Sequence, residues 1–242
     1  NKQEFMAELK MKCILIIPAY NESKNLVNLI DEIKEKAPLF DYVIINDGST
    51  DDTAAICRER GYNAIHLVNN LGIGGAVQTG YMYALTNDYD AAVQIDGDGQ
   101  HNPAYLDRLI EPILAERADF TIGTRFIDSK GFQSSGIRRA GINWLNRVIR
   151  MIARVTITDA TSGFRAANRE VIRLFAGYYP KDYPEPETIA DVARNKFRIE
   201  EVPVEMRERS FGTSSIKLTR SIYYIFKVSL AVLLSGLKKQ DC

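Results

Sequence analysis

Two aspartates separated by a single glycine, Asp96 and Asp98, have the clearest potential for chemistry in this sequence. They follow the apolar segment 91–95, and carboxylates at positions i and i+2 of an extended segment point to the same side. Their oxygens can then converge on one cation. Hard oxygen donors suit Mg²⁺ or Mn²⁺, with substrate phosphates completing the coordination shell. The alternative is an Asp/Gly-rich turn that binds no metal.

The elements that would position this pair alternate between strands and helices. Short apolar runs predict strands at residues 13–17, 42–45, 64–67, 91–95 and 120–123. Helical spacing of apolar residues predicts helices at residues 26–33, 73–85 and 103–116. This alternation predicts an α/β fold with a parallel sheet, in which ligands bind beyond the carboxyl ends of the strands. Glu22, Asp47 and the Asp96/Asp98 pair follow the first, second and fourth strands, so we expect them at one edge.

Beyond residue 124 the alternation is less regular. The pattern predicts helices at residues 137–155 and 188–196, a strand at 199–204, and a loop or short strand at 161–165. The sequence contains no internal repeat, low-complexity tract or linker. We therefore expect a single domain.

Composition limits the classes of function. The 242 residues are 45% hydrophobic, and Lys+Arg and Asp+Glu both total 31, so no overall charge favours nucleic acid as a partner. The three cysteines, Cys13, Cys57 and Cys242, are too far apart for a C-x-x-C metal motif or a disulfide framework. No signal peptide is recognisable, and no segment reaches the ~20 uninterrupted apolar residues of a membrane span.

Seven short motifs in a fixed order give the sequence a family resemblance. They are Ile17-Pro-Ala-Tyr-Asn-Glu22, Asn46-Asp-Gly-Ser-Thr-Asp51, Asn70-Leu-Gly-Ile-Gly-Gly75, the segment 96–101, Gly123-Thr-Arg125, Thr161-Ser-Gly-Phe-Arg165 and Gly212-Thr-Ser-Ser215. The chain resembles the inverting family 2 glycosyltransferases of the GT-A fold, and within them the dolichyl-phosphate mannose synthase-like, polyprenyl-phosphate branch. The resemblance implies a GT-A domain over residues 12–215, with a mixed, mainly parallel sheet flanked by helices, and a C-terminal helix over residues 216–242.

The resemblance also implies roles for individual residues. The nucleotide would be contacted by Pro18, Tyr20, Glu22, Asp47, Gly72, Gly74, Asp96 and, closing over it, Arg209. The metal would be held by Asp96, Asp98 and Gln100. Arg125 and Arg165 would face the acceptor phosphate or the leaving diphosphate, where guanidinium groups stabilise developing negative charge.

The implied activity is metal-dependent transfer of a sugar from a UDP-, GDP- or dTDP-sugar donor to a polyprenyl phosphate in envelope glycan synthesis. An alternative acceptor is a sugar hydroxyl of a cell-wall or capsular glycan. A hydroxyl requires a general base, whereas a phosphate is already anionic and needs none. Glu185 and Glu187 lie where many relatives of this family place that base, and Glu187 would serve. A third alternative is a non-catalytic subunit that only binds a nucleotide sugar.

Two segments could contact a membrane. Residues 141–155 predict a basic amphipathic helix with Arg147, Arg150 and Arg154 on one face, which suits either anionic lipid headgroups or a solvated surface. The apolar tail 222–237 could lie in the membrane interface, pair between subunits of a homo-oligomer or dock on the domain. We expect a cytoplasmic enzyme at the inner face of the plasma membrane.

Overall fold

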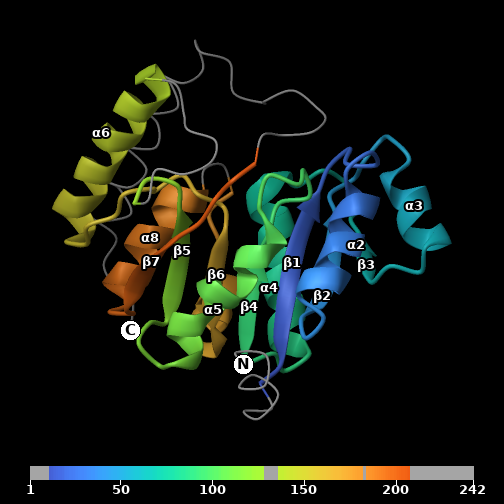
Figure 1. The fold of residues 1–242 in the computed structure, drawn as a ribbon, viewed down its shortest axis with the longest axis horizontal. Coiled ribbons are helices and arrows are strands. Elements are labelled where there is room, and N and C mark those ends of the chain that lie inside the picture. The colour runs from blue at the N-terminus through green and yellow to red at the C-terminus, as the bar shows by residue number, and fades with distance from the viewer. Residues whose placement is uncertain (1–10, 128–135, 182–183, 208–242) are drawn as a thin grey trace.

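A seven-stranded sheet forms the centre of the protein (Figure 1). The computed structural model describes residues 11–127, 136–181 and 184–207. The strands are β1 (Cys13–Ala19), β2 (Asp41–Asn46), β3 (Ala64–His66), β4 (Ala91–Gln94), β5 (Phe120–Thr124), β6 (Arg165–Asn168) and β7 (Ile199–Pro203). Their order is β3-β2-β1-β4-β6-β5-β7, and β6 runs antiparallel to both of its neighbours while the other pairs are parallel. The predicted mixed, mainly parallel sheet is confirmed.

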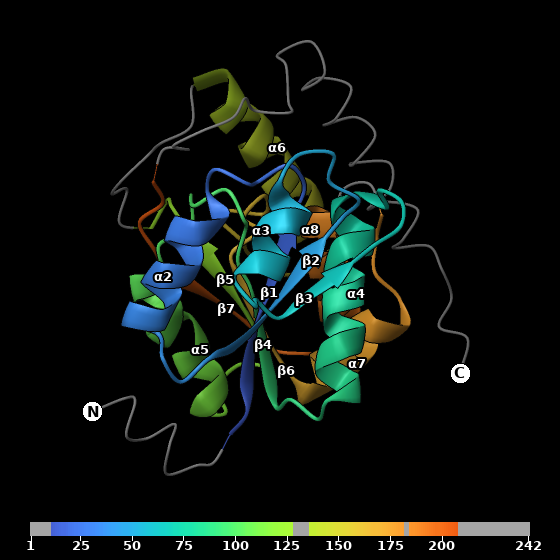
Figure 2. The ribbon, with the colours of Figure 1, turned by 90° about the vertical axis from the view of Figure 1, so that its right-hand side faces the viewer.

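Helices cover both faces of this sheet (Figure 2). They are α2 (Leu26–Lys36), α3 (Thr53–Glu59), α4 (Gly72–Thr86), the 3₁₀ turn η1 (Pro103–Tyr105), α5 (Leu106–Leu114), α6 (Gly136–Ala153), α7 (Arg169–Gly177) and α8 (Pro184–Arg194). Side chains of α2 and α5 enter one hydrophobic cluster, and those of α4, α6, α7 and α8 enter the other. The sheet therefore separates two cores.

The central position of β1 explains its uninterrupted apolar sequence. All seven of its residues are buried because strands flank it on both sides and helices cover both faces. Helix α4 crosses it closely: a Cβ atom added to Gly80 would lie 2.2 Å from Ile16 Cγ2. Only glycine fits at that crossing, which sets the distance between α4 and the sheet.

Two predicted elements differ from the structure, and one helix of the structure was not predicted. Strand β4 ends at Gln94, and the residues that follow it form a turn rather than an extended segment. Helix α8 begins at Pro184, four residues before the predicted start, because a proline is well tolerated in the first turn of a helix. Helix α7 was not predicted; Asn168 caps it by accepting a hydrogen bond from Val171 N at 3.0 Å.

Several predictions concern residues outside the described ranges. Arg209, the domain end at residue 215 and the C-terminal helix 216–242 all lie there. Within the described ranges, no helix has the length and apolar character needed to cross a bilayer.

Candidate active site

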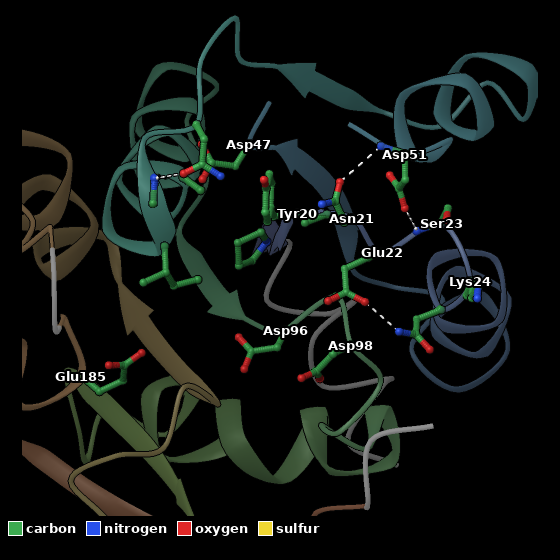
Figure 3. A pocket seen from close by; sticks show the side chains of 18 residues that line it. Tyr20, Asn21, Glu22, Ser23, Lys24, Asp47, Asp51, Asp96, Asp98 and Glu185 are labelled. Atoms are coloured by element: carbon green, nitrogen blue, oxygen red, sulfur yellow. Dashed lines mark hydrogen bonds between the residues drawn. The ribbon is translucent and has the colours of Figure 1, made fainter. Parts of the chain in front are cut away.

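A pocket of about 940 Å³ opens where β1, β2 and β4 end (Figure 3). Many of its lining residues are among those predicted to bind nucleotide or metal: Pro18, Tyr20, Glu22, Asp47, Gly72, Asp96 and Asp98. Because β2, β1 and β4 are parallel neighbours, the segments that follow them meet at the same edge of the sheet. The volume is sufficient for a ligand of nucleotide size.

The acid pair is presented by a turn. Gln100 N donates to Asp98 Oδ1 at 2.9 Å, and Gly99 adopts a φ of 75°, a value that favours glycine. Asp98 is buried at the pocket wall, whereas the Asp96 side chain is about one third exposed. The two carboxylates therefore meet in the pocket because the chain turns, and not because a strand continues through them.

His101 contacts Asp96 from the interior of the protein. Its ring is buried and stacks on Phe164, with 4.8 Å between the ring centroids. Asp96 N donates to His101 Nδ1 at 3.0 Å, which places the ring proton on Nε2, 3.7 Å from Asp96 Oδ2. The imidazole thus holds the backbone of Asp96 in position and lies beside its carboxylate, too far away for a hydrogen bond.

The loop after β1 forms the opposite wall of the pocket. Asn21 has a φ of 59°, and its side-chain oxygen accepts a hydrogen bond from Thr50 N at 2.8 Å. Glu22 N donates to Thr53 Oγ1 at 3.0 Å, and Asn25 Nδ2 donates to Glu22 Oε2 at 2.7 Å. These bonds tie the loops after β1 and β2 to each other and fix the direction of the Glu22 carboxylate.

Asp47 connects β2 to the start of α4. Its Oδ1 accepts a hydrogen bond from Leu71 N at 2.7 Å, and its backbone N donates to Ala19 O at 2.9 Å. Gly72 begins α4 with a φ of 78° and lines the pocket. Gly74 lies away from the pocket, where a Cβ atom would come within 2.1 Å of Pro180 O. Gly74 thus permits close packing.

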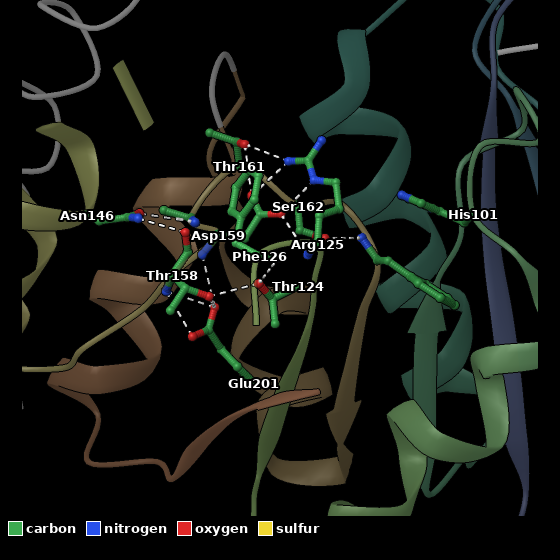
Figure 4. A network of polar contacts seen from close by, with 12 residues as sticks. His101, Thr124, Arg125, Phe126, Asn146, Thr158, Asp159, Thr161, Ser162 and Glu201 are labelled. Atoms are coloured by element: carbon green, nitrogen blue, oxygen red, sulfur yellow. Dashed lines mark hydrogen bonds and ion pairs between the residues drawn. The ribbon is translucent and has the colours of Figure 1, made fainter. Parts of the chain in front are cut away.

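Arg125 forms a buried ion pair (Figure 4). Its Nε and Nη2 donate to the two carboxylate oxygens of Asp159 at 2.7 and 2.8 Å, and Nη2 also donates to Thr161 Oγ1 at 3.1 Å. Asp159 has no exposed surface. The fork geometry suits an arginine and fixes the loop that contains Asp159 and Thr161.

Glu201 completes this network (Figure 4). Its carboxylate accepts hydrogen bonds from the backbone N of Thr158 and of Asp159, at 2.8 and 3.0 Å. Burial raises the pKa of the Glu201 carboxyl, and these donors act in the opposite direction. The side chain of Asn146 in α6 binds the same loop through two hydrogen bonds. It donates to Thr158 O at 2.8 Å and accepts from Ala160 N at 3.3 Å.

Four other predicted site residues do not line the pocket in the described part of the chain. They are Arg125, Arg165, Gln100 and Glu187. The Arg165 guanidinium is fully buried below the pocket, and Gln100 Nε2 reaches Arg207 O at 3.5 Å. Glu187 lies near Tyr178, where its charge contributes to a raised pKa of the phenol.

Glu185 lines the pocket, although of the two neighbouring glutamates the sequence favoured Glu187 as the base. Glu185 and Glu187 are two residues apart in α8, so they point to nearly opposite sides of the helix. Knowing that α8 begins at Pro184 shows that the two glutamates lie on the same helix, and therefore that only one of them can face the pocket.

The acid pair fits a divalent metal that shares its shell with a substrate. Among the residues that the structure describes, no three His, Cys, Asp or Glu side chains form a ready-made cage. Two carboxylates in a pocket large enough for a diphosphate match the way Mg²⁺ is bound, through one or two carboxylates and substrate phosphates. The donor set is all oxygen, which also suits Mn²⁺.

Comparison with known proteins gives consistent matches. The family described as Glycosyl transferase family 2 matches residues 14–175. A polyprenol monophosphomannose synthase from Mycolicibacterium smegmatis is 29% identical over 228 residues, which cover 90% of this chain and 86% of that protein. An undecaprenyl-phosphate mannosyltransferase from Micrococcus luteus is 29% identical over 215 residues, covering 85% and 88%.

The fold has matches among solved structures. Glucosyl-3-phosphoglycerate synthase from Mycobacterium tuberculosis, in complex with Mn²⁺, uridine diphosphate and phosphoglyceric acid, matches with a TM-score of 0.72. The match has 20% sequence identity and covers 100% of this chain and 84% of that chain. At this identity the likeness concerns the fold alone.

Proposed function

Because the chain belongs to glycosyl transferase family 2 and has a GT-A fold, we propose that it transfers a sugar from a nucleotide-sugar donor to a polyprenyl phosphate. The observation that carries this proposal is the meeting of Glu22, Asp47 and the Asp96/Asp98 pair in one pocket. A nucleoside would lie along the loops after β1 and β2, with its diphosphate at the acid pair. Membership of this family identifies the chain as a glycosyltransferase.

The reaction is a single displacement. An oxygen of the acceptor phosphate attacks the anomeric carbon while the bond to the diphosphate breaks on the opposite face, which inverts the configuration. Mg²⁺ or Mn²⁺ held by Asp96 and Asp98 would neutralise the charge that builds on the departing diphosphate. His101 fixes the backbone of Asp96, and the hydrogen bond from Gln100 N fixes the Asp98 carboxylate. The protein thus presents both carboxylates in position before the donor binds.

The names of the relatives support a phosphate acceptor. The two mannosyltransferase relatives are named for polyprenol and undecaprenyl-phosphate acceptors. A phosphate oxygen is already anionic near neutral pH, so transfer to it requires no base. Transfer to a sugar hydroxyl requires one; the predicted base Glu187 does not line the pocket, whereas Glu185, two residues before it, does.

Helix α6 supports a peripheral membrane contact at the inner face of the plasma membrane. Its buried face contains Leu145 and Ile149, while Trp144 and Met151 are 54% and 70% exposed. Arg147 and Arg150 are exposed on the same side, and the helix contains no acidic residue. Arg154 lies beyond the helix end with a φ of 58°. An aromatic and basic surface suits anionic headgroups, where a polyprenyl phosphate would be available.

A transfer assay tests the proposed activity. The purified chain is incubated with Mn²⁺, UDP-, GDP- or dTDP-hexoses and a short-chain polyprenyl phosphate, and glycolipid product is measured. We expect product with one donor class, loss of product on adding a chelator, and at least a hundredfold loss in Asp98→Ala. Glu59→Ala, on the exposed end of α3, is the control and should keep full activity. Full activity of Asp98→Ala, or no product from any donor, would contradict the proposal.

A further inference from the structure

Glu185 places an additional carboxylate in the pocket, on the side of the acid pair away from Lys24 (Figure 3). Every other described lining residue comes from positions 18–98, so Glu185 is the contribution of the C-terminal half of the domain. Burial raises the pKa of its carboxyl, with Arg165 acting in the opposite direction and Asp96 adding to the rise. The Glu185 residue is partly buried, and its carboxylate lies within electrostatic range of Asp96.

Buried Arg165 holds the turn that carries Glu185. Arg165 Nη1 donates to Thr188 Oγ1 at 2.6 Å, and that hydroxyl donates to Pro184 O at 2.7 Å. Arg165 Nε donates to Ser162 O at 2.6 Å. The first turn of α8 is thus connected through one guanidinium to the loop beside Asp96, so the position of the Glu185 backbone is fixed relative to the acid pair.

The order of groups along the pocket indicates what Glu185 meets. In the proposed function, the nucleoside lies against Tyr20 and Asp47 and the diphosphate lies at the acid pair. The next group of the donor is the sugar that is transferred. A carboxylate accepts two hydrogen bonds side by side, which matches neighbouring hydroxyl groups of a hexose.

We propose that Glu185 binds hydroxyl groups of the transferred sugar and thereby orients its anomeric carbon and contributes to the choice of sugar. This inference rests on the proposed function of the pocket. In this role Glu185 accepts hydrogen bonds and moves no proton, so it differs from the general base that a hydroxyl acceptor would require. Arg165 acts as a positioning residue for Glu185 through Thr188.

Paired binding measurements test the role of Glu185. The Kd of a nucleoside diphosphate and the Kd of the matching nucleotide hexose are both measured by calorimetry with Mn²⁺, for the wild type and for Glu185→Ala. Hydrogen bonds to a charged group are strong enough for their loss to change affinity about tenfold or more. We expect the Kd of the nucleotide hexose to rise at least tenfold, while that of the nucleoside diphosphate changes less than about twofold.

Two further variants sharpen the comparison. Glu185→Gln keeps one acceptor oxygen in the same place and should show a smaller increase in the Kd of the nucleotide hexose. Glu187→Ala removes a carboxylate from the same helix but outside the pocket, and should leave both Kd values unchanged. Thermal midpoints close to that of the wild type would show that the variants are folded.

The possible outcomes separate this inference from the function on which it rests. Equal weakening of both ligands would assign Glu185 to the diphosphate or the metal and overturn the inference. Unchanged Kd values with reduced turnover would make it a base and also overturn the inference, while leaving the donor site intact. If the wild type binds none of the nucleotide sugars, the proposed function fails and the role of Glu185 fails with it.

Discussion

Removing Arg125 should destabilise the whole domain, because its partner Asp159 has no exposed surface. Arg125→Met leaves the Asp159 carboxylate without the two charged donors at 2.7 and 2.8 Å. Breaking a buried pair by removing one partner costs about 3–5 kcal/mol. In a chain of this size each kcal/mol lowers the thermal midpoint by roughly 2–4 °C, so a fall of roughly 6–20 °C is expected.

A double-mutant cycle measures this coupling. Thermal or urea unfolding is followed for Arg125→Met, Asp159→Asn and the double variant, and the double variant should be clearly more stable than the sum of the single effects predicts. Arg117→Met is the control, because Arg117 pairs with Glu111 in an exposed bidentate contact that contributes little to stability. Single variants that cost less than about 1 kcal/mol each, with additive effects, would refute a buried structural pair. Unchanged stability with weaker substrate binding would instead support the substrate-facing role that the sequence predicts for Arg125.

Three other outcomes follow from the structure. Gly163→Ala should weaken Mn²⁺ binding about threefold to tenfold in calorimetry, because its Cβ atom would lie 3.3 Å from both Asp96 oxygens; unchanged affinity would argue against Asp96 as a metal ligand. Arg207, with a smaller contribution from Lys36 and against the effect of burial, lowers the pKa of Glu32 from 4.5 to about 2. The stability that the ionised Glu32 carboxylate contributes is therefore complete above pH 4.5 and lost as the pH falls towards 2. In Glu32→Gln, the unfolding midpoint should depend less on pH across that range. Gly80→Ala should cost about 1–3 kcal/mol in urea unfolding, because the new methyl group overlaps a side chain of β1; a neutral result would mean that α4 can move away from the sheet.

The parallel half of the fold could be predicted from the sequence because its signals are local. The apolar run of β1 and the acids that follow β1, β2 and β4 are sufficient to place a site at one edge. The direction of β6 could not be predicted in this way. It is a four-residue strand, Arg165–Asn168, and its antiparallel pairing depends on contacts with β4 and β5 that are distant in sequence.

The sequence also could not show which side chains point into the pocket. The resemblance points to both Glu185 and Glu187, but the sequence does not show which of them faces the pocket. A helix turns by about 100° at each residue, so only Glu185 of the two lines the pocket. Arg125 raises a similar difficulty. The sequence does not show whether its guanidinium faces a ligand or is buried against Asp159. The partner carboxylate lies 34 positions from Arg125.

The reversed direction of β6 brings a late segment of the chain to the pocket edge of the sheet. Since this strand runs against β4 and β5, the chain approaches the rim of the cleft while entering β6, through the loop that contains Gly163, and leaves at the far end. Residues 18–98 supply one wall of the pocket and the chain after β5 supplies Glu185. The two parts are joined because β4 pairs with β6 and because α4 and α7 contribute to one core. Exchanging the chain after β5 would therefore change both the far side of the pocket and the support of the first wall.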